Sequence, residues 1–284
     1  MIDQALPVLS FYKTNYDEKV NNGQQYLLNQ KIVIVGLCRN AETYIQQNIQ
    51  QIVSLLENKC ADYRIVLFEN DSVDSTKNKI NELIDKNNKI ILLSKDFNRP
   101  QFGTVKDVAR TTALAEYRNI LKDYVKNYLA NFDFTIVMDT DFKDFSITGI
   151  YNSFGWLREH NNIEAMCGNS FEIKKVFGPQ DSLWNYDCWA YRGTWWHDWQ
   201  NYPLSEYQNY NQMGWFGLWI LPPGSPPVRI NSGFGGCCIY RTKSFIQADY
   251  SGDDCEHVVF HYDLYQKNPN FNLCLNPAQV MLLK

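Results

Sequence analysis

Short apolar runs alternate with amphipathic segments over the first half of the chain. The run at 31–37 is continuous and rich in β-branched residues, as in a parallel strand that is buried on both faces. Helical segments separate it from further strands, and this β-α-β-α-β-α-β order predicts a doubly wound sheet with right-handed crossovers. The predicted strands cover 31–37, 64–68, 89–93 and 134–138, and a long helix covers 107–128.

The first predicted helix shows the helical spacing most clearly. Its apolar positions are Ile45, Ile49, Ile52 and Leu56, which lie on one face of a helix. Asn40 precedes them and is a residue type that favours helix N-caps, so we expect it to cap this helix.

The pattern changes after about residue 150. Seven of the eight Trp lie in 184–219, and 222–227 has the sequence PPGSPP. Such composition predicts a loop-rich, aromatic lobe. A strand interrupted by glycines is expected over 230–240, and a helix is expected to begin near Asp253 or Asp254.

Composition and charge narrow the class of protein. The 284 residues are 45% apolar and 20% charged, which excludes a disordered chain. With 27 basic and 31 acidic residues the net charge is −4, which argues against nucleic acid as a partner. Neither a signal peptide nor a transmembrane run is evident, so we expect a cytoplasmic protein or one peripheral to a membrane. The eight Cys form no metal-binding spacing and are expected to be mostly reduced and buried.

The clearest chemical signal is Asp139-Thr140-Asp141, a D-x-D motif directly after the strand at 134–138. Ligands of open parallel sheets bind beyond the carboxyl ends of the strands. Two carboxylates there offer hard oxygen ligands to Mn2+ or Mg2+, which can bridge a diphosphate. The alternative is a pair of solvated loop aspartates.

A second polar cluster follows the strand at 64–68. Glu69 and Asp71 lie at the strand end, where carboxylates can accept hydrogen bonds from a base or a ribose. Asp74 or Ser75 can instead cap the next helix. Arg118-Asn119, on the helix before the D-x-D strand, provides a guanidinium suited to phosphate or to an ion pair.

These segments, in this order, resemble the nucleotide-sugar-binding half of GT-A glycosyltransferases. The resemblance rests on KIVIVGLCRN, FENDSVDST, AEYRN and IVMDTD, within residues 31–145. In the second half, YDCWAYR at 186–192, SGFGGCCIYR at 232–241 and DDCEHVVFH at 253–261 are similar to the fungal capsule-associated (alpha-1,3-)mannosyltransferases and their bacterial and viral relatives.

The resemblance implies one GT-A domain over 1–284, an α/β fold with a mostly parallel sheet flanked by helices and a smaller aromatic-rich acceptor lobe. Residues 31–150 would bind the nucleotide diphosphate sugar donor, and 151–284 would bind the acceptor, a glycan or glycoprotein. Arg39 would lie near the base, Glu69 and Asp71 would touch base or ribose, and Asp139 would lie near the ribose. The donor-binding residues implied are Arg39, Glu69, Asp71, Asp74, Arg118, Asn119, Asp139, Thr140, Gly235 and Gly236.

The C-terminal segment supplies the remaining candidates. Glu256 and Asp254 are expected to be catalytic, with Glu256 acting as general base or orienting the acceptor, although acidic residues also stabilise a helix N-terminus. The resemblance implies that Asp141, with Asp139, holds the metal, and that His257 or His261 completes the site. Whichever histidine is not a ligand would be structural. Asp187, Trp189 and Arg192 are expected to contact the acceptor.

The sequence thus predicts a metal-dependent glycosyltransferase that moves a hexose, with mannose as one candidate, from a nucleotide diphosphate sugar to a glycan hydroxyl. Two alternatives stay open. One is a sugar-nucleotide nucleotidyltransferase, which shares the nucleotide-binding sheet. The other is a non-catalytic, Trp-rich carbohydrate-binding protein.

Overall fold

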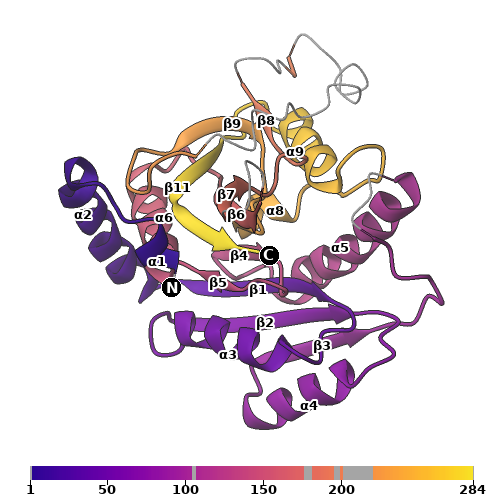
Figure 1. Ribbon diagram of the computed structural model, residues 1–284. Coiled ribbons are helices and arrows are strands. Elements are labelled where there is room, and N and C mark those ends of the chain that lie inside the picture. The colour runs from indigo at the N-terminus through magenta and orange to yellow at the C-terminus, as the bar shows by residue number, and fades with distance from the viewer. Residues whose placement is uncertain (1, 104–106, 176–180, 195–198, 201–219, 284) are drawn as a thin grey trace. The chain divides into compact units, whose positions relative to one another are not determined.

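The computed structural model describes residues 2–103, 107–175, 181–194, 199–200 and 220–283 (Figure 1). The chain forms two compact units. Unit 1 consists of Met1–Tyr26, Phe142–Cys238 and His257–Lys284, and unit 2 consists of Leu27–Asp141 and Ile239–Glu256. The chain therefore passes between the units four times, and each unit is built from segments that are far apart in sequence.

Unit 2 contains the parallel sheet that the apolar runs predict. Its strands are β1 (Lys31–Cys38), β2 (Asp62–Glu69), β3 (Ile90–Ser94) and β4 (Phe134–Met138), in the order β3-β2-β1-β4. All three pairings are parallel. The strand order reverses direction at β1, which creates a place for ligands beyond the carboxyl ends of the central strands.

The helices of unit 2 are α3 (Ile45–Leu56), α4 (Thr76–Lys86), α5 (Val108–Tyr128) and the short α8 (Thr242–Phe245). The predicted spacing of α3 is confirmed, because Ile45, Ile49, Ile52 and Leu56 are all buried. Helix α5 begins where expected because the Asp107 carboxylate accepts a hydrogen bond from the Ala109 N–H at 2.7 Å.

The prediction that Asn40 caps α3 is wrong. The helix begins only at Ile45, after Tyr44, and the side chain of Tyr44 makes no cap hydrogen bond. Asn40 adopts a left-handed conformation with φ of 49°, and its side-chain oxygen accepts a hydrogen bond from the Val73 N–H at 2.9 Å. It therefore joins the loops that follow β1 and β2.

Unit 1 has a mixed sheet. Strands β6 (Ala165–Lys174) and β11 (Leu273–Leu282) pair in parallel, and β9 (Val228–Ser232) and β8 (Arg192–Gly193) continue the sheet as antiparallel strands. Two short strands are added, β5 (Asp144–Phe145) on β11 and β7 (Ser182–Asn185) on β6. Strand β10 (Cys237–Arg241) leads the chain from unit 1 into unit 2.

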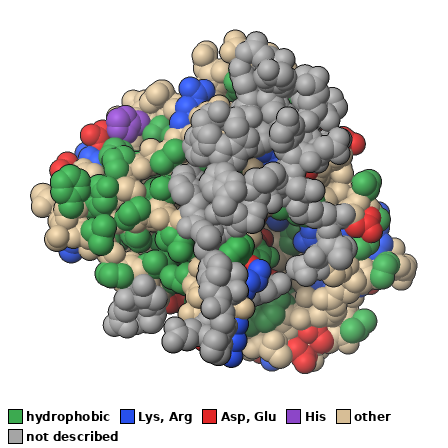
Figure 2. All heavy atoms as spheres, turned by 45° about the horizontal axis from the view of Figure 1, so that its top comes forward, with side chains coloured by type: hydrophobic (Ala, Val, Ile, Leu, Met, Phe, Trp, Pro, Cys, Tyr) green, Lys and Arg blue, Asp and Glu red, His purple; other side chains and the backbone are tan. Residues whose placement is uncertain are grey.

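The helices that begin or lie in unit 1 are α1 (Ile2–Ala5), α2 (Ser10–Leu27) and α6 (Ile147–Glu159), and α9 (Glu256–Lys267) enters it from unit 2. Leu9 and Phe11, at the start of α2, are exposed, and hydrophobic side chains gather on the left of Figure 2, the side on which α2 lies in Figure 1. Among the described helices, none is long and apolar enough to cross a membrane.

Two further expectations concern the second half of the chain. The strand interrupted by glycines that is expected over 230–240 is divided at those glycines into two strands, since β9 ends at Ser232 and β10 begins at Cys237. Most of the Trp-rich stretch, including Trp195, Trp196, Trp215 and Trp219, lies outside the described residues. All eight cysteines are free, and six of them are buried.

Candidate functional site

The D-x-D motif lies where β4 ends, as predicted. Asp141 is exposed and the Asp139 carboxylate is partly exposed, whereas Thr140 is buried. The Thr140 hydroxyl donates to the Leu37 carbonyl at 2.8 Å, and the Asn48 amide donates to the Thr140 carbonyl at 2.8 Å. Thr140 thus anchors the loop to β1 and α3, which holds the two carboxylates in place.

Arg118 lies between the D-x-D motif and Glu256. Its Nε donates to Oε1 of Glu256 at 3.0 Å, and its Nη2 lies 3.6 Å from Oδ1 of Asp139. Both the Arg118 and the Glu256 side chains are more than nine-tenths buried. Burial disfavours the charge of Arg118, but the carboxylates of Glu256 and Asp139 outweigh it and raise the pKa of the guanidinium. The structure therefore brings together three residues predicted from separate motifs.

The segment that carries Glu256 is fastened to α5. The Asn119 amide donates to the Tyr250 carbonyl at 2.9 Å and accepts from the Tyr250 N–H at 2.9 Å. Thr111 also donates its hydroxyl to the Gly252 carbonyl, at 2.7 Å. Asn119, predicted to bind the donor, thus uses both ends of its amide to hold this segment. Asp254, the second catalytic candidate, is partly exposed and accepts from the Cys255 N–H at 2.7 Å.

Tyr44 is a residue at this site that the sequence analysis missed. Burial and then the carboxylates of Asp141, Asp74 and Asp139, together with Cys38, raise the pKa of its phenol. The shift reports a negative potential beside the D-x-D motif. The sequence shows only that Tyr44 follows β1. Its proximity to Asp141 arises from the pairing of β1 with β4, which the sequence around Tyr44 does not record.

The donor set at the D-x-D motif fits a hard divalent cation. Within the described part of the chain, no three His, Cys, Asp or Glu side chains are grouped to hold a metal. Mg2+ does not need such a cage, because it commonly takes one or two carboxylates and completes its shell with water and substrate phosphates. Asp139 and the exposed Asp141, in a region of negative potential, are therefore suitable ligands for Mg2+ or Mn2+.

Glu69, at the end of β2, is fully buried. Its Oε1 accepts from the Ser72 N–H at 2.8 Å, and its Oε2 accepts from the Ser94 hydroxyl at 2.7 Å and lies 3.4 Å from Nζ of Lys77. The carboxylate thus joins β3 and the first residues of α4 to the loop after β2. Contact of Glu69 with a base or ribose stays a prediction.

Asp71 joins two loops at the same end of the sheet. One oxygen accepts from the backbone N–H groups of Phe97 and Asn98, each at 2.7 Å, and the other lies 3.9 Å from Nη1 of Arg39. Arg39 in turn donates to the Arg99 carbonyl at 2.7 Å. Burial opposes ionisation of Asp71, but the hydrogen bonds that it accepts outweigh this and lower its pKa. The predicted base-side residues Arg39 and Asp71 therefore lie together.

Asp74 begins α4. It accepts from the Thr76 N–H at 3.0 Å and from the Glu42 N–H at 3.1 Å, and the Thr76 hydroxyl also donates to it. These bonds outweigh burial and lower the pKa of Asp74. Ser75 precedes the helix without a side-chain cap hydrogen bond. Of the two roles considered for Asp74, its contacts match the start of the helix.

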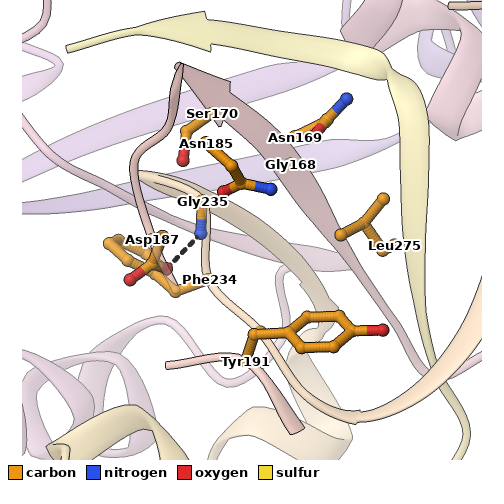
Figure 3. A pocket seen from close by; sticks show the side chains of 10 residues that line it. Gly168, Asn169, Ser170, Asn185, Asp187, Tyr191, Phe234, Gly235 and Leu275 are labelled. Atoms are coloured by element: carbon orange, nitrogen blue, oxygen red, sulfur yellow. Dashed lines mark hydrogen bonds between the residues drawn. The ribbon is translucent and has the colours of Figure 1, made fainter. Parts of the chain in front are cut away.

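In unit 1, Gly235 and Gly236 form the turn between β9 and β10, with φ of +61° and +68°. A Cβ on Gly235 would lie 2.2 Å from the Gly168 carbonyl oxygen, so the turn packs directly against β6. The Gly235 N–H donates to the Asp187 carboxylate at 2.6 Å (Figure 3). Gly168, Asp187 and Gly235 line a pocket within unit 1.

The two histidines of α9 are buried in unit 1. The His257 ring stacks on Phe234 with the ring centroids 3.8 Å apart. The His261 Nδ1 lies 3.0 Å from the Ser232 hydroxyl, and burial lowers the pKa of His261 to about 3. These contacts give both rings a packing role, and metal binding by either one stays a prediction.

Arg192 is almost fully buried and holds its own loop. Its Nη1 donates to the carbonyls of Trp189 and Tyr191, at 2.9 and 2.8 Å. Trp189 is partly exposed. The structure places Arg192 and Trp189 together, and their contact with an acceptor stays a prediction.

No protein-family model and no curated protein matches this chain. Solved structures do. GalNAc-T7, crystallised with UDP, GalNAc and Mn2+, matches with a TM-score of 0.57 and 15% identity, over 89% of this chain and 44% of that one. A mycobacterial protein matches with a TM-score of 0.52 and 11% identity, over 93% of this chain and 71% of that one. Residues 1–349 of S. aureus TarS, in complex with UDP, match with a TM-score of 0.50 and 13% identity, over 88% of this chain and 59% of that one.

The fold is that of the GT-A glycosyltransferases. The predicted fold class is thereby confirmed, and the finer resemblance to the capsule-associated mannosyltransferases is not. At these identities the likeness concerns the GT-A fold alone. The chain spans less than two thirds of the length of the TarS fragment and less than half of GalNAc-T7.

Proposed function

We propose that the protein is a glycosyltransferase, which transfers a hexose from a nucleotide diphosphate sugar to a hydroxyl of a glycan or glycoprotein. The observation that carries this proposal is the contact of Arg118 with both Asp139 and Glu256, beside the D-x-D motif of a GT-A fold. Two of the similar structures contain UDP, and one of these also contains a sugar and Mn2+, which supports the same class of substrate.

The roles of the residues follow from their burial. Arg118 is buried between two carboxylates, so we assign it to positioning Asp139 and Glu256 and not to direct phosphate binding. Glu256 is likewise a positioning residue, because its Oε1 is occupied by Arg118. Asp254, partly exposed just before α9, is then the stronger candidate for contact with the acceptor hydroxyl. Fixed charges of this kind accelerate a reaction through preorganisation.

Asp139 and Asp141 would hold Mn2+ or Mg2+. When bound, such an ion neutralises charge on the diphosphate as the diphosphate leaves. Asp141 is exposed and so is available both to the ion and to a donor. The loops joined by Arg39, Glu69 and Asp71 would form the side that faces the nucleoside.

A thermal-shift screen of nucleotide sugars, with and without Mn2+, tests the proposal. GDP-mannose is the first candidate, because the second half of the chain resembles the capsule-associated mannosyltransferases. A donor that binds only the folded protein raises its stability by about 2.7 kcal/mol at a hundredfold excess over Kd. Transfer is then followed as metal-dependent release of the nucleoside diphosphate.

Asp141→Ala is the decisive variant, and Asp85→Ala on the exposed side of α4 is its control. Both should melt as the wild type does without ligand, because both side chains are exposed. Only Asp141→Ala should lose the Mn2+-dependent shift. An unchanged shift in Asp141→Ala would remove the D-x-D motif from the mechanism. A protein that binds free glycans but no nucleotide sugar would instead be a carbohydrate-binding protein.

A further inference from the structure

Asn48 is a polar residue on the buried face of α3. Its side chain belongs to a residue that is only 4% exposed, and the other buried residues of this helix are apolar: Ile45, Ile49, Ile52, Leu55 and Leu56. Burying an amide among aliphatic side chains costs free energy unless the amide is hydrogen-bonded. The groups that the Asn48 amide contacts should therefore explain why an asparagine stands at this position.

The Asn48 amide reaches the centre of the D-x-D motif. Its Nδ2 donates to the Thr140 carbonyl oxygen at 2.8 Å. That carbonyl belongs to the same planar peptide group as the backbone N–H of Asp141. A fixed direction of the carbonyl therefore fixes the peptide plane from which Asp141 leaves the loop, and with it the direction open to the Asp141 carboxylate.

Strand β1 holds the same loop from another direction. The Thr140 hydroxyl donates to the Leu37 carbonyl at 2.8 Å. A Cβ added to Gly36 would lie 2.8 Å from Cγ2 of Thr140 and 2.9 Å from the Met138 carbonyl oxygen, so β1 approaches the loop too closely for a side chain at position 36. Thr140 is thus held through its side chain by β1 and through its carbonyl by α3.

Two neighbouring carboxylates need such support, because like charges repel each other. The raised pKa of Tyr44 reports a negative potential at this place, and Tyr44 is tied to Asn48, whose N–H donates to the Tyr44 carbonyl at 3.0 Å. In a loose loop, Asp139 and Asp141 would move apart, and bringing them together again would use part of the free energy of cation binding. A loop that is already held in place avoids this cost.

We propose that Asn48 is a positioning residue for the divalent cation: by holding the Thr140 carbonyl it keeps Asp141 oriented toward the ion and so raises the affinity for Mn2+ or Mg2+. The inference rests on the proposed function, because it takes Asp139 and Asp141 as the ligands. In the alternative, the amide only satisfies a buried carbonyl. A substitution would then lower the stability of the protein without changing its affinity for the cation.

Asn48→Leu in the full chain tests the proposal, with Asn152→Leu as its matched control. Leucine keeps the branched outline of asparagine but lacks the amide. Asn152 is also a buried helix residue, in α6 of unit 1, where its Nδ2 donates to the Tyr16 carbonyl at 3.3 Å and its Oδ1 accepts from the Asn276 amide at 3.1 Å. Mn2+ binding is measured from the EPR signal of free Mn2+, with and without UDP or GDP, and thermal unfolding is measured without metal.

We expect both variants to melt at a lower temperature, because each loses the hydrogen bonds of a buried amide. Asn48→Leu alone should weaken Mn2+ binding, by about tenfold, as when the support of a metal ligand is removed. Saturating Mn2+ should restore nucleotide binding to Asn48→Leu, because its carboxylates are intact, and should not restore it to Asp141→Ala. Asn48→Ala adds no bulk and should weaken Mn2+ binding as Asn48→Leu does.

Two results would overturn the proposal: equal Mn2+ affinity in wild type and both Asn48 variants, or the same loss of affinity in Asn152→Leu. A wild type that binds no Mn2+ under either condition would also overturn it. Failure of the proposed function is a different result. A wild type that binds Mn2+ through Asp141 but binds no nucleotide sugar would refute the transferase, and the role of Asn48 would still be decided by Mn2+ alone. Metal-dependent binding of a nucleotide sugar that is unaffected by the loss of the Asn48 amide would refute only the role of Asn48.

Discussion

Arg118 on α5 donates its Nε to Oε1 of Glu256, the first residue of α9, across 138 positions of sequence. Both side chains are buried, and the second carboxylate beside Arg118 is Asp139 of the D-x-D motif. One guanidinium thus couples the predicted metal-binding motif to the predicted catalytic segment. A substitution at Glu256 should therefore alter the electrostatic environment of Asp139.

A double-mutant cycle measures this coupling. Arg118→Met should lower the free energy of unfolding by about 3–5 kcal/mol, because it leaves the buried Glu256 carboxylate without Arg118 as its charged partner. Glu256→Gln should lower it less, because Arg118 keeps the carboxylate of Asp139. The double variant should lose less than the sum of the two single losses. Urea denaturation of the four proteins gives the coupling energy, and strictly additive losses would show that the ion pair does not act as a unit.

Asp71 should hold the loop after β3 in place. Asp71→Ala removes the acceptor of the Phe97 and Asn98 N–H groups, so both amides should exchange with deuterium faster than in the wild type. Glu69→Ala should leave these two amides protected but destabilise the protein by about 1–3 kcal/mol, because a buried acceptor of several donors is lost. Hydrogen exchange followed by mass spectrometry checks both outcomes.

Donor binding in the same two variants separates base recognition from loop support. If Glu69 and Asp71 only support the loops, binding of UDP- and GDP-sugars should weaken to the same extent. Unequal losses would show that one of the carboxylates contacts the base directly.

His261 should make the stability of the protein depend on pH. Burial lowers its folded pKa to about 3 from the usual 6.5, so between these values the unfolded chain binds a proton that the folded chain does not. The stability contributed by neutral His261 is complete above pH 6.5 and is lost as the pH falls. The loss should be about 2 kcal/mol between pH 7 and 5.

Denaturant unfolding over this pH range compares the wild type with His261→Gln and with the control His160→Gln, which is exposed at the end of α6. The slope with pH should be shallower in His261→Gln and unchanged in His160→Gln. Equal slopes in all three proteins would mean that His261 binds its proton equally well in the folded and unfolded states, so that folding does not shift its pKa.

Gly235 and Gly236 are adjacent turn residues whose alanine variants can be compared directly. Both have a positive φ, for which an alanine costs about 1–2 kcal/mol. At Gly236 the atoms nearest to an added Cβ would be in the side chains of Leu283, at 3.1 Å, and Met281, at 3.3 Å. At Gly235 an added Cβ would lie 2.2 Å from the Gly168 carbonyl oxygen, which is backbone. Gly235→Ala should therefore destabilise the protein more than Gly236→Ala does, and thermal unfolding of both variants measures the difference.

Much of unit 2 could be predicted from the sequence. Continuous apolar runs are diagnostic of strands that are buried on both faces, and β4 spans the predicted residues 134–138. The helix predicted over 107–128 matches α5, because Asp107 is a strong N-cap residue. The sequence also predicts the D-x-D motif at the end of β4, because Asp139 directly follows the apolar run at 134–138.

Unit 1 could not be predicted in the same way, because its buried strands contain polar residues. Strand β11 includes Asn276 and Gln279, both buried, and their amides bond to Ser153 and to the Cys237 carbonyl. These partners lie on α6 and β10, far along the chain. A buried amide is tolerated only when such a partner is present, and hydrophobic periodicity does not record it.

The sequence by itself determined the types of group available to the site: two carboxylates after β4, an arginine on α5, and an acidic segment before α9. Only the tertiary structure decided how they are paired. The sequence left Arg118 equally suited to phosphate and to an ion pair, and the fold buries it against Glu256 at 3.0 Å. The physical reason is that a guanidinium's role depends on which charges reach it after burial, and those charges come from segments that local sequence does not connect.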